Sequence, residues 1–122
     1  MESKQQTGRL GERIALEYLE REGYEILEKN WRYRRTEIDL IARDDKVLVF
    51  IEVKTVSDIT LGPPERNISR RKLKLYLDGA SIYMEKIDHS EEIRFDFIGI
   101  LLKDPRSYDL QHIRDAYWPD WG

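Results

Sequence analysis

The stretch from Arg35 to Thr55 constrains the fold of this chain more than any other. Its sequence, RTEIDLIARDDKVLVFIEVKT, predicts two apolar strands joined by a short acidic turn. Side chains alternate between the two faces of a strand. Each strand is therefore predicted to have one apolar face, made of Ile38, Leu40 and Ala42 on the first and of Val47, Val49, Ile51 and Val53 on the second.

The turn between the strands can centre on Asp44-Asp45 or one residue further on. The first choice pairs Asp39 with Phe50, and the second pairs it with Glu52. Both registers put Asp39, Glu52 and Lys54 on the same side of the sheet, within cross-strand or diagonal reach. Two carboxylates and an ammonium group on an otherwise apolar surface predict a divalent-metal site.

Length and charge limit the classes of protein. The chain has 122 residues, 40% apolar and 37% charged, which is typical of one globular domain covering residues 1–122 with a charged surface. A net charge of -3 gives no overall basic field, so a nucleic-acid site must be a local patch. The chain contains no cysteine, which excludes thiol nucleophiles, disulfides and cysteine-zinc sites.

No targeting or membrane segment is expected. The N-terminal sequence MESKQQTG lacks the apolar core of a signal peptide, and the longest apolar run, Val47 to Ile51, is far shorter than a membrane span. We therefore expect a cytoplasmic protein.

A first helix is predicted over roughly residues 5–22. Ser3 to Gln6 fits a capping box, apolar residues follow at helical spacing, and Gly23 suits the end of the helix. Glu12 lies along the buried stripe of this helix, where its carboxylate would point toward the sheet. An edge glutamate paired with Arg9 or a neighbouring basic residue explains the same pattern.

A second helix is predicted to begin near Asn67, with one apolar face running from Leu73 to Ile87. Its first turns carry four basic residues: Arg70, Arg71, Lys72 and Lys74. Such a run is more often a solvated face. It would also contact phosphate, since a helix N-terminus favours anions.

Tyr24 to Lys29 is predicted as a short strand, and NWRYRR at residues 30–35 as its extension. The alternation of aromatics with arginines would suit a phosphate backbone or stacked bases, with Arg34 and Arg35 as candidates. It is more typical of a half-buried edge strand with solvated charges.

The remaining sequence completes the predicted order. Residues 56–66 form a loop, Glu92 to Leu102 a central strand in which Asp96 pairs with a basic neighbour, and residues 108–116 a final edge strand. Trp118 and Trp121 are expected to pack on the body of the protein or on a partner subunit. His89 and His112 are expected at the surface or an edge. The order helix-strand-strand-strand-helix-strand predicts an α+β core or an α/β core with a mixed sheet, with a helix on each face.

The predicted site suits a hard divalent cation. Mg²⁺ or Mn²⁺ binds one or two carboxylates and keeps several waters, which Asp39 and Glu52 allow, with the carbonyl of Val53 between Glu52 and Lys54. A metal held there polarises a phosphodiester and activates water. Lys54 would orient or deprotonate that water, or neutralise charge on the phosphate.

Asp39 followed by Glu52-Val53-Lys54 after a short hairpin resembles the PD-(D/E)XK nuclease superfamily. The chain more narrowly resembles the YraN family of small bacterial proteins over nearly its whole length, in the blocks GERIALEYLEREGYEILEKNWR, TEIDLIARDD, VLVFIEVKT, RKLKLYLDGASIY, RFDFIGI and HIRDAYW. Ile38 stands in place of the proline of the superfamily's name, and Thr36 in place of the family's usual glycine.

This resemblance implies a restriction-endonuclease-like fold and a nuclease of the Holliday-junction-resolvase type. It implies that Asp39 and Glu52 bind metal, that Lys54 is the catalytic lysine and that Glu12 is a helix-borne acid. Lys72 falls where the family tends to place a helix lysine.

Three functions are compatible with these residues. The first is a Mg²⁺- or Mn²⁺-dependent endonuclease acting on DNA, with branched DNA as a candidate substrate. A homodimer would suit that substrate, since paired cuts require two related sites. The second is a nucleic-acid-binding module with the nuclease fold but little catalysis. The third is a structural adaptor in which the charged cluster is an ion-pair network, although buried ion pairs seldom add stability.

Overall fold

The alternating apolar segments of the sequence all become strands of one sheet. The computed structural model describes residues 4–57, 70–104 and 106–116, except the side chains of Lys4 and Arg70. In these ranges the elements are α1 (Lys4–Arg21), β1 (Glu25–Tyr33), β2 (Thr36–Asp44), β3 (Val47–Val56), α2 (Arg70–Lys86), β4 (Ile93–Asp104) and β5 (Ser107–Ile113).

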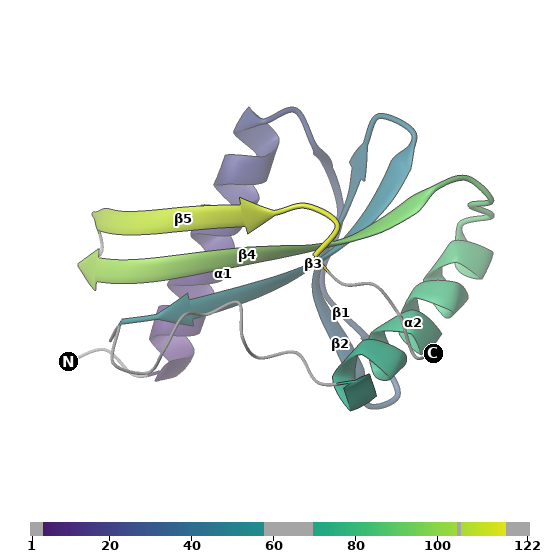
Figure 1. Ribbon diagram of the computed structural model, residues 1–122, viewed down its shortest axis with the longest axis horizontal. Coiled ribbons are helices and arrows are strands. Elements are labelled where there is room, and N and C mark those ends of the chain that lie inside the picture. Colours follow the sequence, from purple (N-terminus) through teal and green to yellow (C-terminus); the bar gives the residue numbers. More distant parts are fainter. Residues whose placement is uncertain (1–3, 58–69, 105, 117–122) are drawn as a thin grey trace.

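The sheet is mixed and follows the chain order β1-β2-β3-β4-β5. Only β3 and β4 pair in parallel, and the other neighbours are antiparallel. Parallel strands need a crossover connection, and α2 lies in the connection between β3 and β4 (Figure 1). The predicted α/β fold with a mixed sheet is confirmed, and β5 is the predicted final edge strand.

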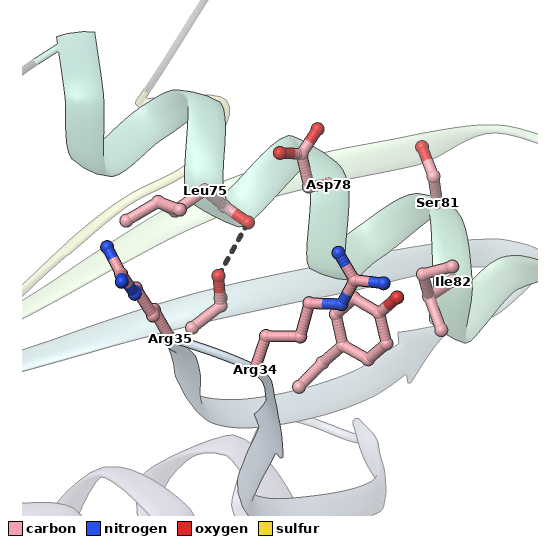
Figure 2. Close-up of a pocket in the computed structure, with 8 residues that line it drawn as sticks. Arg34, Arg35, Leu75, Asp78, Ser81 and Ile82 are labelled. Atoms are coloured by element: carbon pink, nitrogen blue, oxygen red, sulfur yellow. Dashed lines mark hydrogen bonds between the residues drawn. The ribbon is translucent and has the colours of Figure 1, made fainter.

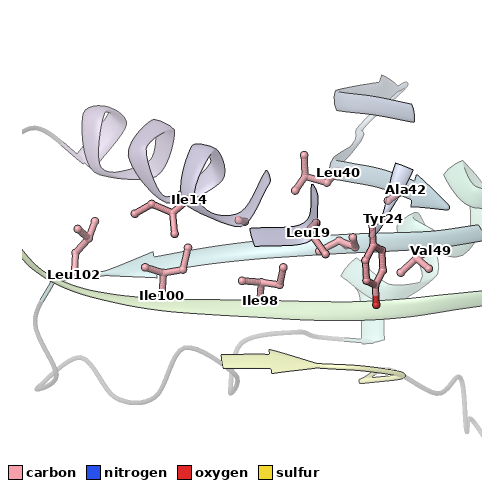
Figure 3. Close-up of a cluster of buried hydrophobic side chains, with 11 residues drawn as sticks. Ile14, Leu19, Tyr24, Leu40, Ala42, Val49, Ile98, Ile100 and Leu102 are labelled. Atoms are coloured by element: carbon pink, nitrogen blue, oxygen red, sulfur yellow. The ribbon is translucent and has the colours of Figure 1, made fainter. Parts of the chain in front are cut away.

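The two helices cover opposite faces of the sheet, as predicted. The apolar stripe of α1, including Ile14 and Leu19, packs on Val49, Ile98 and Ile100 (Figure 3). The stripe of α2 packs on the other face in a second buried cluster, formed by Ile38, Ile41, Leu48, Phe50, Leu73, Tyr76, Ala80, Tyr83, Phe95 and Phe97. Each layer therefore rests on its own half of the apolar core.

The end of α1 explains how the chain enters the sheet. Gly23 has a φ of 90°, a conformation that glycine adopts without steric cost. Its N–H donates to the carbonyl of Glu20 over 3.1 Å, and the N–H of Tyr24 donates to that of Leu19 over 2.9 Å. This pair of hydrogen bonds, with Tyr24 and Leu19 packed together, is a Schellman cap, so the predicted role of Gly23 is confirmed.

A buried polar network ties α1 to the β4–β5 edge of the sheet. Asp96 is fully buried and accepts hydrogen bonds from Arg94 Nε over 2.8 Å, from His112 Nε2 over 2.8 Å and from the N–H of Asp115 over 2.9 Å. His112 Nδ1 lies 2.9 Å from the hydroxyl of Tyr18 on α1. Burial alone would raise the pKa of Asp96, and these donors hold it below its usual value.

The network confirms the prediction for Asp96, and for His112 it shows an edge position with a buried side chain. Asp96 pairs with the basic neighbour Arg94, as expected. His112 lies on the edge strand β5, but its side chain is only 4% exposed and is not a surface residue. The alternation of β5 turns His112 inward beside Ile98, where it fills the space between Asp96 and α1.

Several predictions fall outside the described residues: the cap at Ser3, the helix start near Asn67, most of the loop at 56–66 and the packing of Trp118 and Trp121. Within the described ranges, neither helix has the length and apolar character needed to cross a membrane.

The buried network predicts a large cost for removing one charge. Asp96→Asn keeps the shape of the side chain but leaves the guanidinium of Arg94, which is 15% exposed, without its buried counter-charge. We expect a loss of about 3 kcal/mol in the free energy of unfolding, measured by urea titration. Asp109→Asn is the control, because it breaks a pair to Lys103 whose side chains are 58% and 68% exposed, and it should cost about 0–1 kcal/mol. Equal losses for both variants would contradict the assignment.

Candidate functional site

The hairpin of β2 and β3 adopts the second predicted register. Asp44 pairs with Val47 across a turn at Asp45 and Lys46, and the backbone ladder runs as far as the pair Leu40 and Ile51. Beyond this pair the two strands separate (Figure 1).

The carboxylate of Asp39 takes the place of the next backbone contact. The N–H of Val53 donates to Asp39 Oδ2 over 2.8 Å. The carboxylate therefore satisfies a backbone donor that the diverging strands would otherwise leave without a partner. This places Asp39 at the fork between β2 and β3.

The alternation of β2 changes at Asp39. Leu40 and Ala42 belong to the core under α1, whereas Ile38 and Ile41 belong to the core under α2. The prediction that Ile38 shares a face with Leu40 and Ala42 is therefore wrong.

The reason is that a period of two assumes an unbroken pleat. At this position the facing residue on β1, Asn30, has a φ of 50° and makes no ladder pair with Asp39. The irregularity puts the side chain of Asp39 between the two layers, where groups from both can reach it.

The predicted site residues meet at one cavity. A cavity of about 520 Å³ is lined by Asp39, Glu52, Val53 and Lys54, together with Arg35, Lys72 and five other residues. The hairpin prediction thus brought the two carboxylates and the lysine to the same place, and the cavity adds basic residues from the β1–β2 turn and from α2.

Glu52 is a buried carboxylate with a partner on α2. The residue is 7% exposed, and its Oε1 accepts a charged hydrogen bond from Lys72 Nζ. Lys54 lines the same cavity but makes no ion pair with another described residue. The sequence pattern assigned Lys72 to phosphate contact. It missed the pair with Glu52 because the two residues are 20 positions apart along the chain.

Glu12 approaches the same fork from α1. It lines a neighbouring cavity of about 210 Å³ rather than the main one. Its partner among the described residues is Asn30, not Arg9. With the amide nitrogen facing the carboxylates, Asn30 donates to Glu12 Oε1 over 3.3 Å and to Glu37 Oε1 over 3.1 Å. Sequence reasoning missed Asn30, whose only signal was a turn-favouring residue inside an expected strand.

Burial and crowding of carboxylates raise the proton affinity of two acids at the fork. The pKa of Asp39 is raised to about 7: burial raises it most, the Val53 N–H lowers it, and the charges of Glu12, Glu52 and Glu37 raise it. Burial also raises the pKa of Glu12, Asn30 lowers it, and Glu37 raises it. Glu37 is itself paired with Arg32 over 2.9 Å. Glu37 and Glu52 therefore have ion-pair partners, whereas Asp39 and Glu12 make no ion pair with another described residue.

The donor set suits a hard divalent cation. Carboxylate oxygens from Asp39 and Glu52, with the carbonyl of Val53, are the ligands that Mg²⁺ prefers, and Mg²⁺ keeps several waters. In the described ranges no three histidine or acidic side chains form a complete metal cage. A cation at this site would therefore be held by few protein ligands, and the crowded carboxylates would gain from its charge.

Two of the predicted nucleic-acid residues, Arg35 and Lys72, line this cavity. Arg35 lines it, and Arg34 precedes Arg35 on the exposed β1–β2 turn. Arg71 is exposed in the first turn of α2. The side chain of Arg70 lies outside the described residues. NWRYRR forms the end of the edge strand β1 and the turn that follows it, with Trp31 and Tyr33 half-buried and Arg32 and Arg34 exposed, as that interpretation expected.

The position of α1 depends on a glycine next to Glu12. A Cβ on Gly11 would overlap the side chain of Thr55, which lines the main cavity. Glycine here allows α1 to approach the end of β3, and this approach brings Glu12 toward Asp39.

The pKa of Asp39 makes folding stability depend on pH. The unfolded carboxyl ionises near 3.8, whereas the folded one keeps its proton up to about pH 7. Between these values the folded state binds more protons. The stability from this group is therefore present below pH 3.8 and is lost as the pH rises through 7, by up to ~1.4 kcal/mol per pH unit.

Asp39→Asn removes this titration. Relative to the wild type, the variant should gain stability steadily from pH 3.8 to about 7 and show no further relative gain above that. Urea unfolding of both proteins across this range measures the difference. A difference that does not change with pH would contradict the raised pKa.

Two glycines of α1 form a matched pair for testing the contact with β3. Gly11→Ala should cost roughly 1–3 kcal/mol, because the new methyl group overlaps Thr55. A methyl group on Gly8 would have no neighbouring atom within 4 Å, so Gly8→Ala should stabilise the protein by roughly 0.5–1 kcal/mol through helix propensity. Thermal unfolding distinguishes the two. A gain in stability for both variants would show that α1 does not depend on this contact.

Comparison with known proteins identifies relatives across nearly the whole chain. The profile of the uncharacterised protein family UPF0102 matches residues 11–100. A UPF0102 protein of Flavobacterium psychrophilum is 37% identical, over 91% of this chain and 92% of its own length. One from Chlorobium limicola is 40% identical over 94% of both chains, and one from Beutenbergia cavernae is 38% identical over 93% of this chain and 98% of its own. The chain therefore belongs to the uncharacterised protein family UPF0102.

Proposed function

We propose that this protein is a divalent-metal-dependent nuclease of the PD-(D/E)XK type that hydrolyses phosphodiester bonds in DNA. The observation that carries the proposal is the fork between β2 and β3. There the Asp39 carboxylate accepts the Val53 N–H, and Glu52 and Lys54 line the same cavity. A structural role alone does not explain why these residues line a cavity to which Arg35 and Lys72 also contribute basic side chains.

The electrostatics support a cation-dependent site. Buried groups with strongly shifted pKa values mark candidate functional sites. Asp39 is such a group, because burial and three nearby carboxylates oppose its ionisation. Asp39, Glu52 and the Val53 carbonyl would hold Mg²⁺ or Mn²⁺, which when bound polarises a phosphodiester and lowers the pKa of water.

The remaining residues have separate roles in this proposal. Lys54 has no carboxylate partner in the described structure, so its ammonium group can orient the attacking water or offset charge at the phosphate. Lys72 holds the carboxylate of Glu52 in place from α2. Asn30 holds Glu12 near Asp39, which makes Glu12 a further acid at the edge of the site.

The DNA backbone would follow the basic residues around the cavity. Arg34 and Arg35 are exposed on the β1–β2 turn, and Arg71 is exposed at the start of α2. Phosphate contacts of this kind position a nucleic acid without reading its sequence. A homodimer would bring two such sites to a branched substrate.

One observation favours a second candidate, a DNA-binding module with little catalysis. Lys72 already neutralises Glu52, so this carboxylate has a partner without any metal. A protein in which Lys72 stays in this position would bind DNA through its arginines but would activate water poorly.

A nicking assay tests the proposed chemistry. Purified protein with Mn²⁺ should nick plasmid or branched DNA, and Glu52→Gln should abolish the nicking because the neutral amide is a poor ligand for a hard cation. Lys54→Ala should reduce the rate by about 100-fold or more, the contribution typical of a positioned acid-base group.

Glu85→Gln is the control, because Glu85 is an exposed carboxylate near the end of α2, and this variant should cut like the wild type. Circular dichroism should show the same fold in all variants. Nicking that survives Glu52→Gln would place the chemistry elsewhere. DNA binding without nicking, unaffected by EDTA, would favour the second candidate.

A further inference from the structure

A second groove continues from the proposed active-site cavity. It has a volume of about 520 Å³ and lies between the β1–β2 turn and the outer side of α2 (Figure 2). It shares Arg35, Thr36 and Leu75 with the cavity that contains Asp39 and Glu52. The two spaces therefore adjoin each other at these three residues.

A hydrogen bond fixes the width of the groove where the two spaces join. The hydroxyl of Thr36, a buried residue, donates to the carbonyl of Leu75 on α2 over 2.9 Å (Figure 2). Gly79 lets the same helix approach closely, since a Cβ there would lie 3.2 Å from Thr36 Cγ2. The packing of α2 against Thr36 therefore sets the width of the groove. The width does not depend on surface side chains alone.

The two ends of the groove differ in charge. Arg35 lies at the end next to the cavity, whereas Asp78 and Ser81 lie further along α2 (Figure 2). A phosphate group fits beside the arginine and is disfavoured beside the carboxylate of Asp78. A neutral group with hydrogen-bond donors fits the far end, because carboxylates accept hydrogen bonds from the amino groups of bases.

A flat cationic platform lies between these ends. The guanidinium of Arg34 lies over the ring of Tyr33, with Arg34 Cζ 5.3 Å from the ring centroid. Arg34 makes no ion pair with another described residue, and it has a φ of 55°, which favours glycine. Glycine would be less strained than arginine at this position of the turn. The fold itself therefore does not require the Arg34 side chain, which points to a role in binding.

We propose that this groove binds an unpaired nucleotide adjacent to the phosphate that is cleaved. The inference rests on the proposed function. The phosphate of this nucleotide contacts Arg35, its base stacks on the platform of Arg34 and Tyr33, and the edge of the base bonds with Asp78 and Ser81. Guanidinium planes and aromatic rings are the groups on which proteins stack unpaired bases.

The proposal defines the substrate class. A base inside a duplex is stacked on both sides and paired at its edge, so it is not available to this groove. The enzyme would therefore prefer single-stranded DNA, or a branch point with an unpaired nucleotide beside the cut, over intact duplex.

Binding measured in EDTA tests the groove without contribution from cleavage. The probes are a short fluorescent single-stranded oligodeoxynucleotide, an abasic deoxyribose-phosphate chain of the same length and charge, and the corresponding duplex. Wild type should bind the intact single strand roughly tenfold more tightly than the abasic chain, the effect expected for one stacked base. It should also bind the single strand more tightly than the duplex.

Arg34→Gly separates a role in the groove from a role in folding. It should bring the ratio of affinities for intact and abasic strands close to one, while the melting temperature stays the same or rises as the strained φ is relieved. Asp45→Gly is the matched control, because Asp45 has a φ of 56° in the β2–β3 turn and does not line the groove. It should leave the ratio unchanged.

Three results would overturn the inference: no measurable binding, equal affinity for intact and abasic strands, or an unchanged ratio in Arg34→Gly. The nicking assay distinguishes failure of this inference from failure of the proposed nuclease function. Equal affinities in a protein that nicks DNA with Mn²⁺ refute only the groove. Discrimination by a protein that nicks nothing supports the groove and refutes the nuclease.

Discussion

The hydrogen bond from the Val53 N–H to the Asp39 carboxylate is the interaction on which the site depends. Two antiparallel strands can separate inside a protein only if their unpaired backbone groups find other partners. At the end of the ladder between β2 and β3, a side chain supplies that partner. The strands can then diverge without a buried orphan donor, and the space between them becomes a cavity. Moving the Asp39 carboxylate away would leave the Val53 N–H without its acceptor and would also change the charge of the site.

Two aspartates, the fully buried Asp96 and the half-buried Asp39, show how environment separates structure from function. Asp96 accepts hydrogen bonds from Arg94, from His112 and from a backbone N–H, and its pKa is lowered. Among the residues that the structure describes, Asp39 has the single donor Val53; it lies among other carboxylates, and its pKa is raised to about 7. A network in which every acceptor is satisfied stabilises one conformation. An incompletely balanced carboxylate stays available for a cation or a proton, at a cost to stability.

The sequence was sufficient for features that follow from local pattern. The alternation around Asp39 and Glu52 predicted both strands, and the acidic turn limited the register to two choices, one of which is present. It was insufficient where geometry departs from the pattern. The change of face at Asp39 arises from an irregular backbone at Asn30, and the Lys72–Glu52 pair depends on how α2 docks. His112 was missed because a single histidine carries no periodic signal, and only the packing of β5 against α1 shows that it is buried.

The net charge of -3 is compatible with a nucleic-acid partner once the charges are placed in space. Carboxylates at the fork, such as Asp39 and Glu52, are buried or half-buried, whereas Arg34, Arg35 and Arg71 are exposed on the turn and helix beside it. An approaching polyanion meets the exposed cations first, and screening over about 8 Å at physiological salt weakens its repulsion by distant acidic residues. A bound divalent cation would further offset the charge at the fork. The net charge of the whole chain bears on solubility. What can bind at this site depends on which charges are exposed at the surface and which are buried.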